Sequence, residues 1–490
     1  MSFQGLLHHR SSLRRVVLAS SLGLLVTGSA LGFTDEEIFR GLNLHPQIPG
    51  ARALGMGGAF RGLADDATAA VTNPAGLAFL DRPEFFAEMR TTNPDSINVG
   101  GSGVYLDAGA EAFARGLTIF DDDTTTGPSY VGYVHPLTER WVMAFTRYER
   151  HRLDRELAAS YFSTMHVLED VPTGLEVEVL HTGGDLDMLV DNYMVSAAVA
   201  IHEQFSLGLS IGVSRIDVTS QMTNSFGQPV DTDGDGLDNT LLRALDYETR
   251  IDDEDTSFTG VFGLLWRPHP KIRVGAEYTF GPEFDIVQEL RPEGARAGAL
   301  RSELISQGVA NTSGLFINNM KMPDSYGVGL SFGPFFEPRG GGGLVINADV
   351  VHVEYTDILD GFVGGLNNQL FGASAAGAIF EIEDEEQLHL GLAYSWTVGY
   401  NNRAHVRAGV YTEPDHSIVT GGRLTGVRHP VTGALVQAGL FSGIDDDDDV
   451  HFTLGGGFTI KRGFNSFSLD VAADFSDFGS QYVGSAFFKF

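Results

Sequence analysis

Residues 387–398, "QLHLGLAYSWTV", alternate large apolar side chains with small or polar ones. Leu388 falls on one face with the other apolar residues, whereas His389 falls on the opposite face. Residues 271–280 and 466–475 repeat the pattern. A period of two predicts a β-strand with one apolar and one polar face. The alternation persists for about ten residues, which is long for a soluble strand and suits a tilted membrane crossing.

The composition of the two faces favours a membrane barrel over a soluble sandwich of two sheets. The polar faces are rich in Gly, Ser and Ala and carry few of the Lys and Glu side chains typical of a water-facing sheet. The apolar faces carry aromatic residues near their ends, as do the interfacial girdles of membrane barrels. These residues are Trp141, Tyr193, Trp266 and Trp396. In lipid, strands satisfy every backbone polar group only in a closed sheet.

Fourteen segments of this kind are expected along the chain. They cover residues 84–92, 128–136, 141–150, 193–202, 205–219, 257–267, 271–281, 326–335, 343–353, 387–398, 404–412, 450–461, 465–476 and 481–490. Short joints follow the even-numbered segments, and long polar joints follow the odd-numbered ones except the last. Periplasmic turns alternate with extracellular loops in this way in outer-membrane barrels. We therefore predict an all-β protein, a 14-stranded antiparallel transmembrane β-barrel over residues 84–490, in the outer membrane of a Gram-negative-type bacterium.

The chain ends with "YVGSAFFKF", in which apolar residues alternate up to Phe490. A final strand that closes on an aromatic residue resembles the signal read by the outer-membrane barrel assembly machinery. The alternative is an ordinary edge strand. Lipid and lipopolysaccharide are the expected surroundings, and a monomer is the expected state.

The composition and the N-terminal residues further limit the class of protein to which this chain can belong. The formal net charge is −32, which disfavours a basic surface for nucleic acid. There is no Cys, so disulfides and thiolate metal sites are excluded. Residues 1–30 combine a basic start with a short apolar run at 16–26, and this pattern predicts a signal peptide cleaved after Ala30. After Ala30 no apolar run is long enough for a transmembrane helix.

Residues 31–83 precede the first strand and are predicted to form an N-terminal hatch (plug). A fourteen-stranded barrel is too wide for its own side chains to fill, so an unplugged lumen would leak. Glycines permit close packing and unusual dihedral angles, two aspartates are placed to cap a short helix, and "NPAG" fits a type I turn. The alternative is a flexible leader. The expected hatch residues are Gly55, Gly57, Gly58, Asp65, Asp66, Asn73, Pro74, Ala75 and Gly76.

The segment "GMGGAFRGLADDATAAVTNPAGLAFLDRPEFF", together with "NPDSINVGG" at 93–101, resembles the FadL/TodX family of outer-membrane transporters for long-chain fatty acids and other hydrophobic compounds. The resemblance is strong over residues 50–101 and diffuse elsewhere. It implies a barrel plugged by a hatch, an apolar landing groove on the outer loops, an inner site near the hatch, and passive sideways release through the wall. It also implies that Phe33 lies near the inner ligand site. The chain departs from the family pattern by an insertion at residues 34–52.

Two other functions share parts of this pattern. PorV-like barrels, which serve secretion, also carry "GARALGMGGAF" and "NPAGLA", so a secretion or assembly factor that binds protein partners is the alternative function. A general porin would need an open, charged lumen, which a plug of this length disfavours. Enzymatic activity is not expected, because His389 and Asp470 face inward with no nucleophile motif beside them.

Two loop segments are candidate ligand-binding sites, one for hydrophobic molecules and one for calcium. Residues 297–310 place Leu300, Leu304 and Ile305 at helical spacing, and apolar helices there would form a surface groove for hydrophobic small molecules. The alternative is that these helices only pack on each other. In "DTDGDGLDN", the alternating oxygen ligands suit a structural calcium ion, the alternative being a solvated acidic loop. The candidate calcium ligands are Asp231, Asp233, Asp235 and Asp238. No other cofactor is expected.

Overall fold

The computed structural model of the chain describes residues 47–94, 97–100, 105–107, 111–113, 115–122, 124–166, 174–230, 240–293, 315–335, 343–358, 379–399, 402–414, 419–421, 435–437, 448–477 and 479–490. Within these ranges no helix combines the length and the apolar character needed to cross a membrane.

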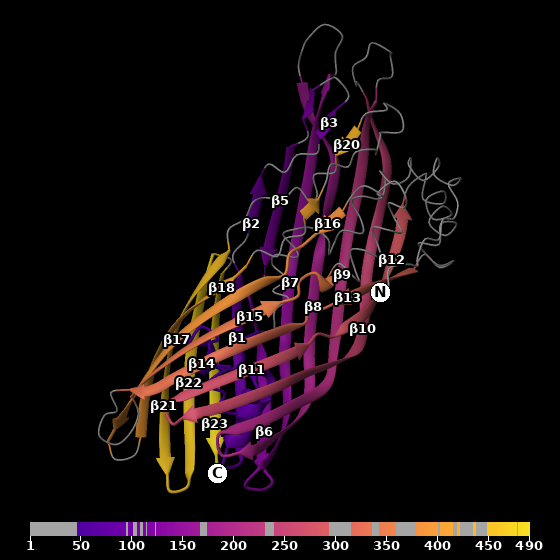
Figure 1. Ribbon diagram of the computed structural model, residues 1–490. Coiled ribbons are helices and arrows are strands. Elements are labelled where there is room, and N and C mark those ends of the chain that lie inside the picture. The colour runs from indigo at the N-terminus through magenta and orange to yellow at the C-terminus, as the bar shows by residue number, and fades with distance from the viewer. Residues whose placement is uncertain are drawn as a thin grey trace, which may run out of the picture.

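Fourteen antiparallel strands close into a barrel, which confirms the predicted fold (Figure 1). In ring order they are β1 (Glu84–Pro94), β6 (Thr125–Pro136), β7 (Trp141–His166), β8 (Gly174–His202), β9 (Phe205–Val230), β10 (Thr240–His269), β11 (Ile272–Phe280), β14 (Ser325–Phe335), β15 (Gly343–Val353), β17 (Glu385–Val398), β18 (Asn402–Glu413), β21 (Asp449–Arg462), β22 (Asn465–Ser476) and β23 (Gly479–Lys489). The first and last strands pair from Glu84 opposite Lys489 to Pro94 opposite Gly479, so the described barrel wall closes on itself.

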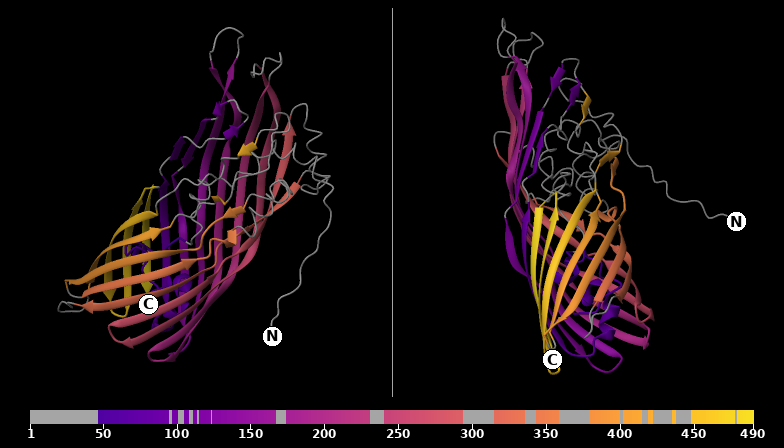
Figure 2. Two further views of the ribbon diagram at one scale, coloured as in Figure 1. Left: turned by 45° about the horizontal axis from the view of Figure 1, so that its top comes forward. Right: turned by 90° about the vertical axis from the view of Figure 1, so that its left-hand side faces the viewer.

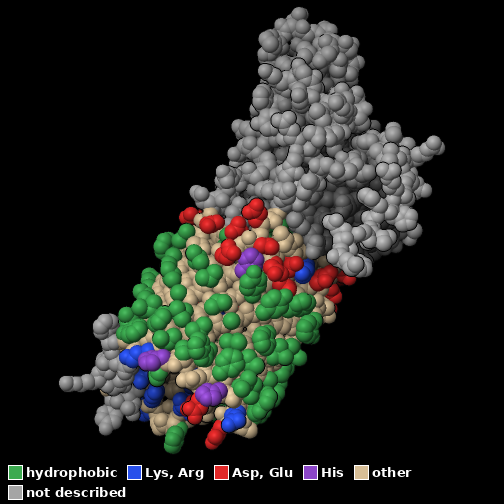
Figure 3. Space-filling view, in the orientation of Figure 1, with side chains coloured by type: hydrophobic (Ala, Val, Ile, Leu, Met, Phe, Trp, Pro, Cys, Tyr) green, Lys and Arg blue, Asp and Glu red, His purple; other side chains and the backbone are tan. Residues whose placement is uncertain are grey.

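An apolar belt surrounds the outside of the barrel. Leu388, Leu390 and Leu392 of β17 are 52, 55 and 47% exposed, while His389 between them is 1% exposed. Figure 3 shows apolar side chains over the visible wall, a rim rich in Asp and Glu at one end of them, and most of the Lys and Arg side chains, with some Asp or Glu, at the other. The short turns lie at this second end. By the usual orientation of such barrels it is the periplasmic end.

Four neighbouring strands, β7 to β10, are much longer than the sequence pattern predicts. They contain 26, 29, 26 and 30 residues and rise on one side of the barrel (Figure 2). The predicted segments 141–150, 193–202, 205–219 and 257–267 therefore cover only part of each strand. The longer parts form the extracellular extension of the wall.

The polarity of β9 inverts along its length, which explains these short predictions. In its lower half Ser210 is buried inside and Ile211 is exposed outside. In its upper half Ile216 is buried inside, whereas Arg215 and Asp217 face out. The strand leaves the lipid at this point, so its outer face becomes polar while its inner face becomes apolar.

Shorter strands flank the extension. On one side β5 (Arg115–Asp122) pairs with β7 and with β2 (Ile97–Gly100). On the other side β12 (Glu283–Glu293) pairs with β10 and with β13 (Leu315–Lys321). Two small sheets complete the described strands: β16 (Ile379–Glu381) with β19 (Val419–Gly421), and β20 (Leu435–Gln437) with β3 (Tyr105–Asp107) and β4 (Glu111–Phe113).

Candidate functional site in the barrel lumen

Residues 47–83, hereafter the plug, lie inside the barrel (Figure 1). The plug contains three short helices, α2 (Ala51–Leu54), α3 (Ala69–Thr72) and the 3-10 helix η3 (Pro74–Phe79). Most of its apolar side chains are buried, Met56 and Leu77 completely. Hydrogen bonds join the plug to inward side chains on strands all round the ring, such as Thr453 of β21 and Ser206 of β9. The lumen is therefore filled at this level by the N-terminal part of the chain.

Of the four predicted hatch glycines, Gly55, Gly57 and Gly58 are required for different physical reasons. Gly57 and Gly58 have φ angles of +61° and +74°, which L side chains rarely adopt. Gly55 instead has an ordinary helical φ of −63°, so the expectation of an unusual dihedral there was wrong. Glycine suits that position because there is little room for a side chain: an added Cβ would lie 3.0 Å from the Cα of Gly455 on β21.

The two predicted capping aspartates divide their roles. Asp66 is not the N-cap of α3, because Thr68 occupies that position; Asp66 instead accepts hydrogen bonds from the backbone N–H and the hydroxyl of Thr68, at 3.0 and 2.6 Å. Asp65 does not cap the helix, which corrects the prediction for this residue; it forms ion pairs with Arg52 at 2.7 Å and with Arg273 of β11 at 3.2 Å. Asp65 therefore joins two parts of the plug to the wall.

The "NPAG" segment begins η3, so the expected turn continues into a 3-10 helix. The Asn73 side chain accepts a hydrogen bond from Ala75 N–H at 3.2 Å and donates to the carbonyl oxygens of Arg61 and Leu264, at 2.9 and 3.1 Å. Leu264 belongs to β10, so one fully buried amide holds the turn, the rest of the plug and the wall together.

A row of inward glycines, hereafter the glycine seam, receives the plug. On each of these glycines an added Cβ would lie within 2.5 Å of a plug atom, closer than real Cβ contacts allow. The seam consists of Gly208 (β9), Gly263 (β10), Gly275 (β11), Gly329 (β14), Gly391 (β17) and Gly409 (β18). The small residues on the inner faces of these strands therefore make room for direct contact between plug and wall.

Buried polar side chains fix the plug against the same strands. The Asp349 carboxylate of β15 accepts hydrogen bonds from the backbone N–H groups of Phe60 and Arg61, both at 2.8 Å. The Arg61 side chain reaches Glu277 of β11 at 2.8 Å. His389 donates from Nδ1 to the carbonyl oxygen of Gly57 at 2.7 Å. His389 thus anchors the plug.

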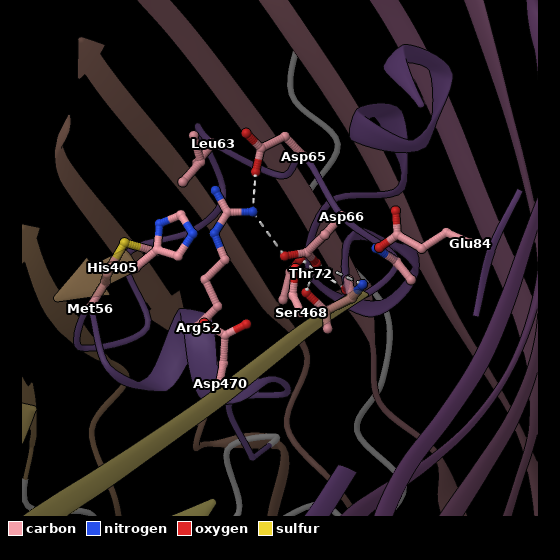
Figure 4. Close-up of polar contacts among 12 residues, drawn as sticks. Arg52, Met56, Leu63, Asp65, Asp66, Thr72, Glu84, His405, Ser468 and Asp470 are labelled. Carbon is pink, nitrogen blue, oxygen red and sulfur yellow. Dashed lines mark hydrogen bonds and ion pairs between the residues drawn. The ribbon is translucent and has the colours of Figure 1, made fainter. Parts of the chain in front are cut away.

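On the side of β18, β21 and β22, charged side chains also lie between plug and wall, beside the glycine contacts of Gly409 and Gly455. Figure 4 shows Arg52 of α2 bonded to Asp65 and Asp66, with His405 and Asp470 of the wall close by. Burial opposes ionisation of Asp65, but the guanidinium groups of Arg52 and Arg273 outweigh it and lower the pKa of Asp65 to about 2. Asp470 forms its own ion pair with Arg407 at 2.6 Å.

The hydrogen-bonded wall is interrupted between β6 and β7. The two strands pair only as far as Tyr130 opposite Tyr148. Above this point β7 pairs with β5, starting at Arg155 opposite Asp122. Among the described residues, the strand pairing of β7 with β6 and with β5 does not cover 125–129 of β6 and 149–154 of β7. A register shift of β7 against β8 falls at the same height, between Glu149 and His151.

Side chains and the start of the plug close this gap. On its outer side Arg147 donates to the carbonyl oxygen of Pro128 and forms an ion pair with Asp191 at 2.6 Å. On its inner side Gln47 donates its backbone N–H to the carbonyl oxygen of Arg150 at 3.1 Å and accepts a hydrogen bond from the Tyr148 hydroxyl. The first described residues of the plug therefore lie against an interruption in the described wall.

Above the plug, the inner face of the extension is apolar. The residues of this upper apolar cluster are Leu153, Leu186, Met188, Val190, Ile216, Val218, Met222, Ile251, Phe284, Ile286, Met320, Met322, Val351, Val353, Tyr355, Ile358 and Ile382. Most lie on one arc of the wall, from β7 to β15, and four lie just outside strands: Met322, Tyr355, Ile358 and Ile382. These side chains are at most 6% exposed and form a packed apolar core, whereas the inner faces of water-filled porins are polar.

Arg150 lies at the lower edge of this cluster, beside the gap. It is 2% exposed, and its Nε and Nη2 atoms have no hydrogen-bond partner among the described residues. The next residue, His151, pairs with Val190 of the cluster. A buried guanidinium without a direct anionic partner is costly, and a bound carboxylate would remove most of that cost. Periodicity does not reveal Arg150, because it occupies the register shift.

Several predicted ligand residues lie outside the described residues, so their roles stay predictions. They are Phe33 near the inner site, Leu300, Leu304 and Ile305 of the loop groove, and Asp231, Asp233, Asp235 and Asp238 of the calcium loop.

The closed antiparallel barrel with its apolar belt defines the chain as a multi-pass β-barrel protein of the Gram-negative outer membrane. No family model matches the sequence, and the search of curated proteins finds no match. Among solved structures, the chain is similar to a Pseudomonas aeruginosa FadL homologue, with a TM-score of 0.54 and 13% identity over 91% of this chain and 98% of that one. This likeness confirms the FadL/TodX resemblance at the level of the fold.

Two further similar structures are toluene transporters. TodX of Pseudomonas putida has a TM-score of 0.47 and 14% identity, over 90% of this chain and 97% of that one. TbuX of Ralstonia pickettii has a TM-score of 0.45 and 12% identity, over 91 and 98%.

Proposed function

We propose that this protein carries hydrophobic molecules with an anionic head, such as long-chain fatty acids, passively inward across the outer membrane. Three features of the described lumen support the proposal: an apolar inner surface above the plug, a buried guanidinium at its lower edge, and an interrupted wall beside that guanidinium. A hydrophobic tail would pack on the upper apolar cluster while the carboxylate meets Arg150.

The buried guanidinium of Arg150 is the reason to propose an acidic cargo rather than a neutral hydrocarbon. A toluene-like cargo would leave its guanidinium without a counter-charge and add to the desolvation. A carboxylate would receive charge-assisted hydrogen bonds from Nε and Nη2, in the planar geometry that suits a guanidinium.

The first residues of the plug suggest how release of the cargo is gated and where the cargo leaves the barrel. The glycine seam holds residues 56–75 against strands on most sides, whereas Gln47 reaches the gap through only the contacts described above. We propose that Gln47 forms the gate, and that its displacement lets cargo pass sideways between β6 and β7 into the membrane. Neither step needs an energy source built into the chain.

The test compares uptake of labelled oleate and labelled toluene into proteoliposomes that contain the wild-type protein or Arg150→Gln. Loss of a charge-assisted pair costs about 1.5–3 kcal/mol, so oleate affinity should fall roughly 10- to 150-fold. Toluene uptake should be unchanged or higher. Arg215→Gln, which removes an exposed arginine from the outer face of β9, is the matched control. Equal oleate affinity in both variants, or no oleate uptake above protein-free vesicles, would overturn the proposal.

A further inference from the structure

Four buried ionisable side chains meet at the extracellular end of β18, β21 and β22. Glu413 is the last residue of β18 and Asp449 is the first of β21, so both lie at the end opposite the short turns. His451 follows two residues later on β21, and Asp474 lies near the corresponding end of β22. All four are at most 9% exposed, whereas Val450, between two of them, is exposed on the outer face. These four inward-facing residues are hereafter the mouth cluster.

The strand register places two carboxylates of the mouth cluster directly opposite each other. In the β18–β21 ladder Glu413 is the partner of Asp449, and Tyr411 is the partner of His451. Residues two apart on a strand share a face, so Glu413, Asp449 and His451 project from one patch of the inner wall. Like charges directly opposite each other destabilise a sheet. A cation that bridged the two carboxylates would remove this repulsion.

The imidazole of His451 approaches both of these carboxylates. Its Nε2 atom lies 3.3 Å from Asp449 Oδ2 and 3.4 Å from Glu413 Oε2. These separations are longer than ordinary hydrogen bonds, and Nε2 makes no hydrogen bond among the described residues. They match the distance of about 3.3–3.4 Å between two ligands of a tetrahedral ion whose bonds are about 2.0–2.1 Å long. A buried nitrogen without a hydrogen-bond partner therefore faces two oxygen ligands.

The other imidazole nitrogen is held by the fourth member of the mouth cluster. His451 Nδ1 lies 3.2 Å from both carboxylate oxygens of Asp474, which also accepts a hydrogen bond from the Tyr411 hydroxyl at 2.7 Å. The Tyr411 ring stacks on the imidazole, with centroids 4.1 Å apart. Histidines that bind metals commonly donate their other N–H to a carboxylate, which fixes the ring. His451 is thus oriented to offer Nε2 as a ligand.

Charge and ligand type favour a divalent transition metal over a proton in the mouth cluster. Three of its four members are carboxylates, and a protonated imidazole would supply only one positive charge against them. Buried charges are costly unless they are compensated. One imidazole nitrogen with two carboxylate oxygens suits Zn²⁺, whereas Ca²⁺ and Mg²⁺ prefer sites made of oxygen ligands alone.

We propose that Glu413, Asp449 and His451 bind a Zn²⁺ ion at the extracellular mouth of the barrel, with Asp474 orienting the imidazole. The ion would draw the two carboxylates together and leave a fourth position for water, as zinc sites with three protein ligands do. It would tie the end of β18 to the start of β21, just above Thr453, which accepts a hydrogen bond from the plug. This inference does not depend on the cargo, because the mouth cluster shares no residue with the upper apolar cluster or the β6–β7 gap.

The test is Zn²⁺ binding by the purified, tag-free full-length protein in detergent, stripped with EDTA and freed of the chelator. Isothermal titration calorimetry should show one site in the wild type that is lost in His451→Gln and in Glu413→Gln. Asp474→Asn should weaken binding roughly 10- to 100-fold, the usual effect of losing the carboxylate behind a histidine ligand. The matched control is His352→Gln on the outer face of β15, whose histidine pairs with the single carboxylate of Glu386. This control should bind Zn²⁺ as the wild type does.

Co²⁺ in place of Zn²⁺ gives a second readout, since a four-coordinate ion should produce a strong visible absorption band in the wild type and none in His451→Gln. Heat-modified gel migration of unboiled samples checks that each variant is folded. Zn²⁺ affinity that is equal in the wild type and folded His451→Gln would overturn the proposal. So would Ca²⁺ binding as tight as Zn²⁺ binding, which would indicate a site of carboxylates alone. Loss of the site in His352→Gln would place the ion elsewhere and would also overturn the proposal.

Discussion

A Cβ added to Gly208 of β9 would lie 2.1 Å from the carbonyl carbon of Pro74, so the wall and the plug meet backbone to backbone. Gly208→Ala should therefore push η3 away from β9 and loosen the seal. Overpacking of this kind costs about 1–3 kcal/mol. We expect a larger single-channel conductance in planar bilayers and a lower unfolding temperature.

The control for Gly208→Ala is Gly484→Ala on β23, where an added Cβ has nothing within 4 Å. Both changes add one methyl group to a wall strand, so the effects of replacing Gly by Ala on β-strand propensity are matched. If the two variants had the same conductance, close packing at the glycine seam would not be what seals the lumen.

Asn73→Ala removes the amide that joins the plug turn to β10. Two backbone carbonyl oxygens and one N–H group in a fully buried site would lose their partner. Unsatisfied buried groups cost about 1–3 kcal/mol each before relaxation, so the plug should open more often while the barrel stays closed. Hydrogen–deuterium exchange should accelerate at residues 61–76 and stay unchanged in β17.

Asn73→Asp separates the two functions of this side chain. The carboxylate still accepts from Ala75 N–H, but it repels the carbonyl oxygens of Arg61 and Leu264. We expect exchange as fast as in Asn73→Ala or faster. Wild-type exchange in Asn73→Asp would show that the two donated hydrogen bonds contribute nothing to holding the plug.

The barrel was predictable from the sequence because lipid imposes a simple rule on side-chain alternation. Leu388 and Gly391 follow that rule: one faces lipid, and the other makes room for the plug at Met56. Above the membrane the rule changes, as Ile216 of β9 shows, and the predicted strands end too early. Alternation places residues on a face but says nothing of which distant residues meet there.

The contacts of the plug were not predictable for this reason. Asp65 looks like a helix cap from its neighbours in the chain, yet it binds Arg273, 208 residues away. Arg150 occupies a register shift, where the period of two fails. Both roles depend on the closure of the ring, which brings β7, β11 and the plug together.

The ion pairs of Asp65 predict that the stability of the folded protein depends on pH in the acid range. Its pKa is lowered from 3.8 to about 2, so its carboxylate stabilises the folded protein above pH about 4. This contribution is lost as the pH falls from about 4 through 2. The unfolding temperatures of wild type and Asp65→Asn should therefore differ at pH 5 and converge near pH 2. A difference that persists at pH 2 would contradict the assigned pKa.

Arg147 closes the outer side of the gap between β6 and β7, and the absence of Cys in the chain makes this gap accessible to selective labelling. Proteoliposomes that contain the Arg147→Cys variant should still take up oleate, because the contacts of Gln47 hold the inner side of the gap closed. A bulky maleimide on this cysteine should block the sideways exit and abolish uptake. The matched control is Arg215→Cys on the outer face of β9, where the same label should leave uptake unchanged. Undiminished uptake after complete labelling at position 147 would exclude the β6–β7 gap as the exit, whereas equal inhibition at both positions would attribute the block to the label itself.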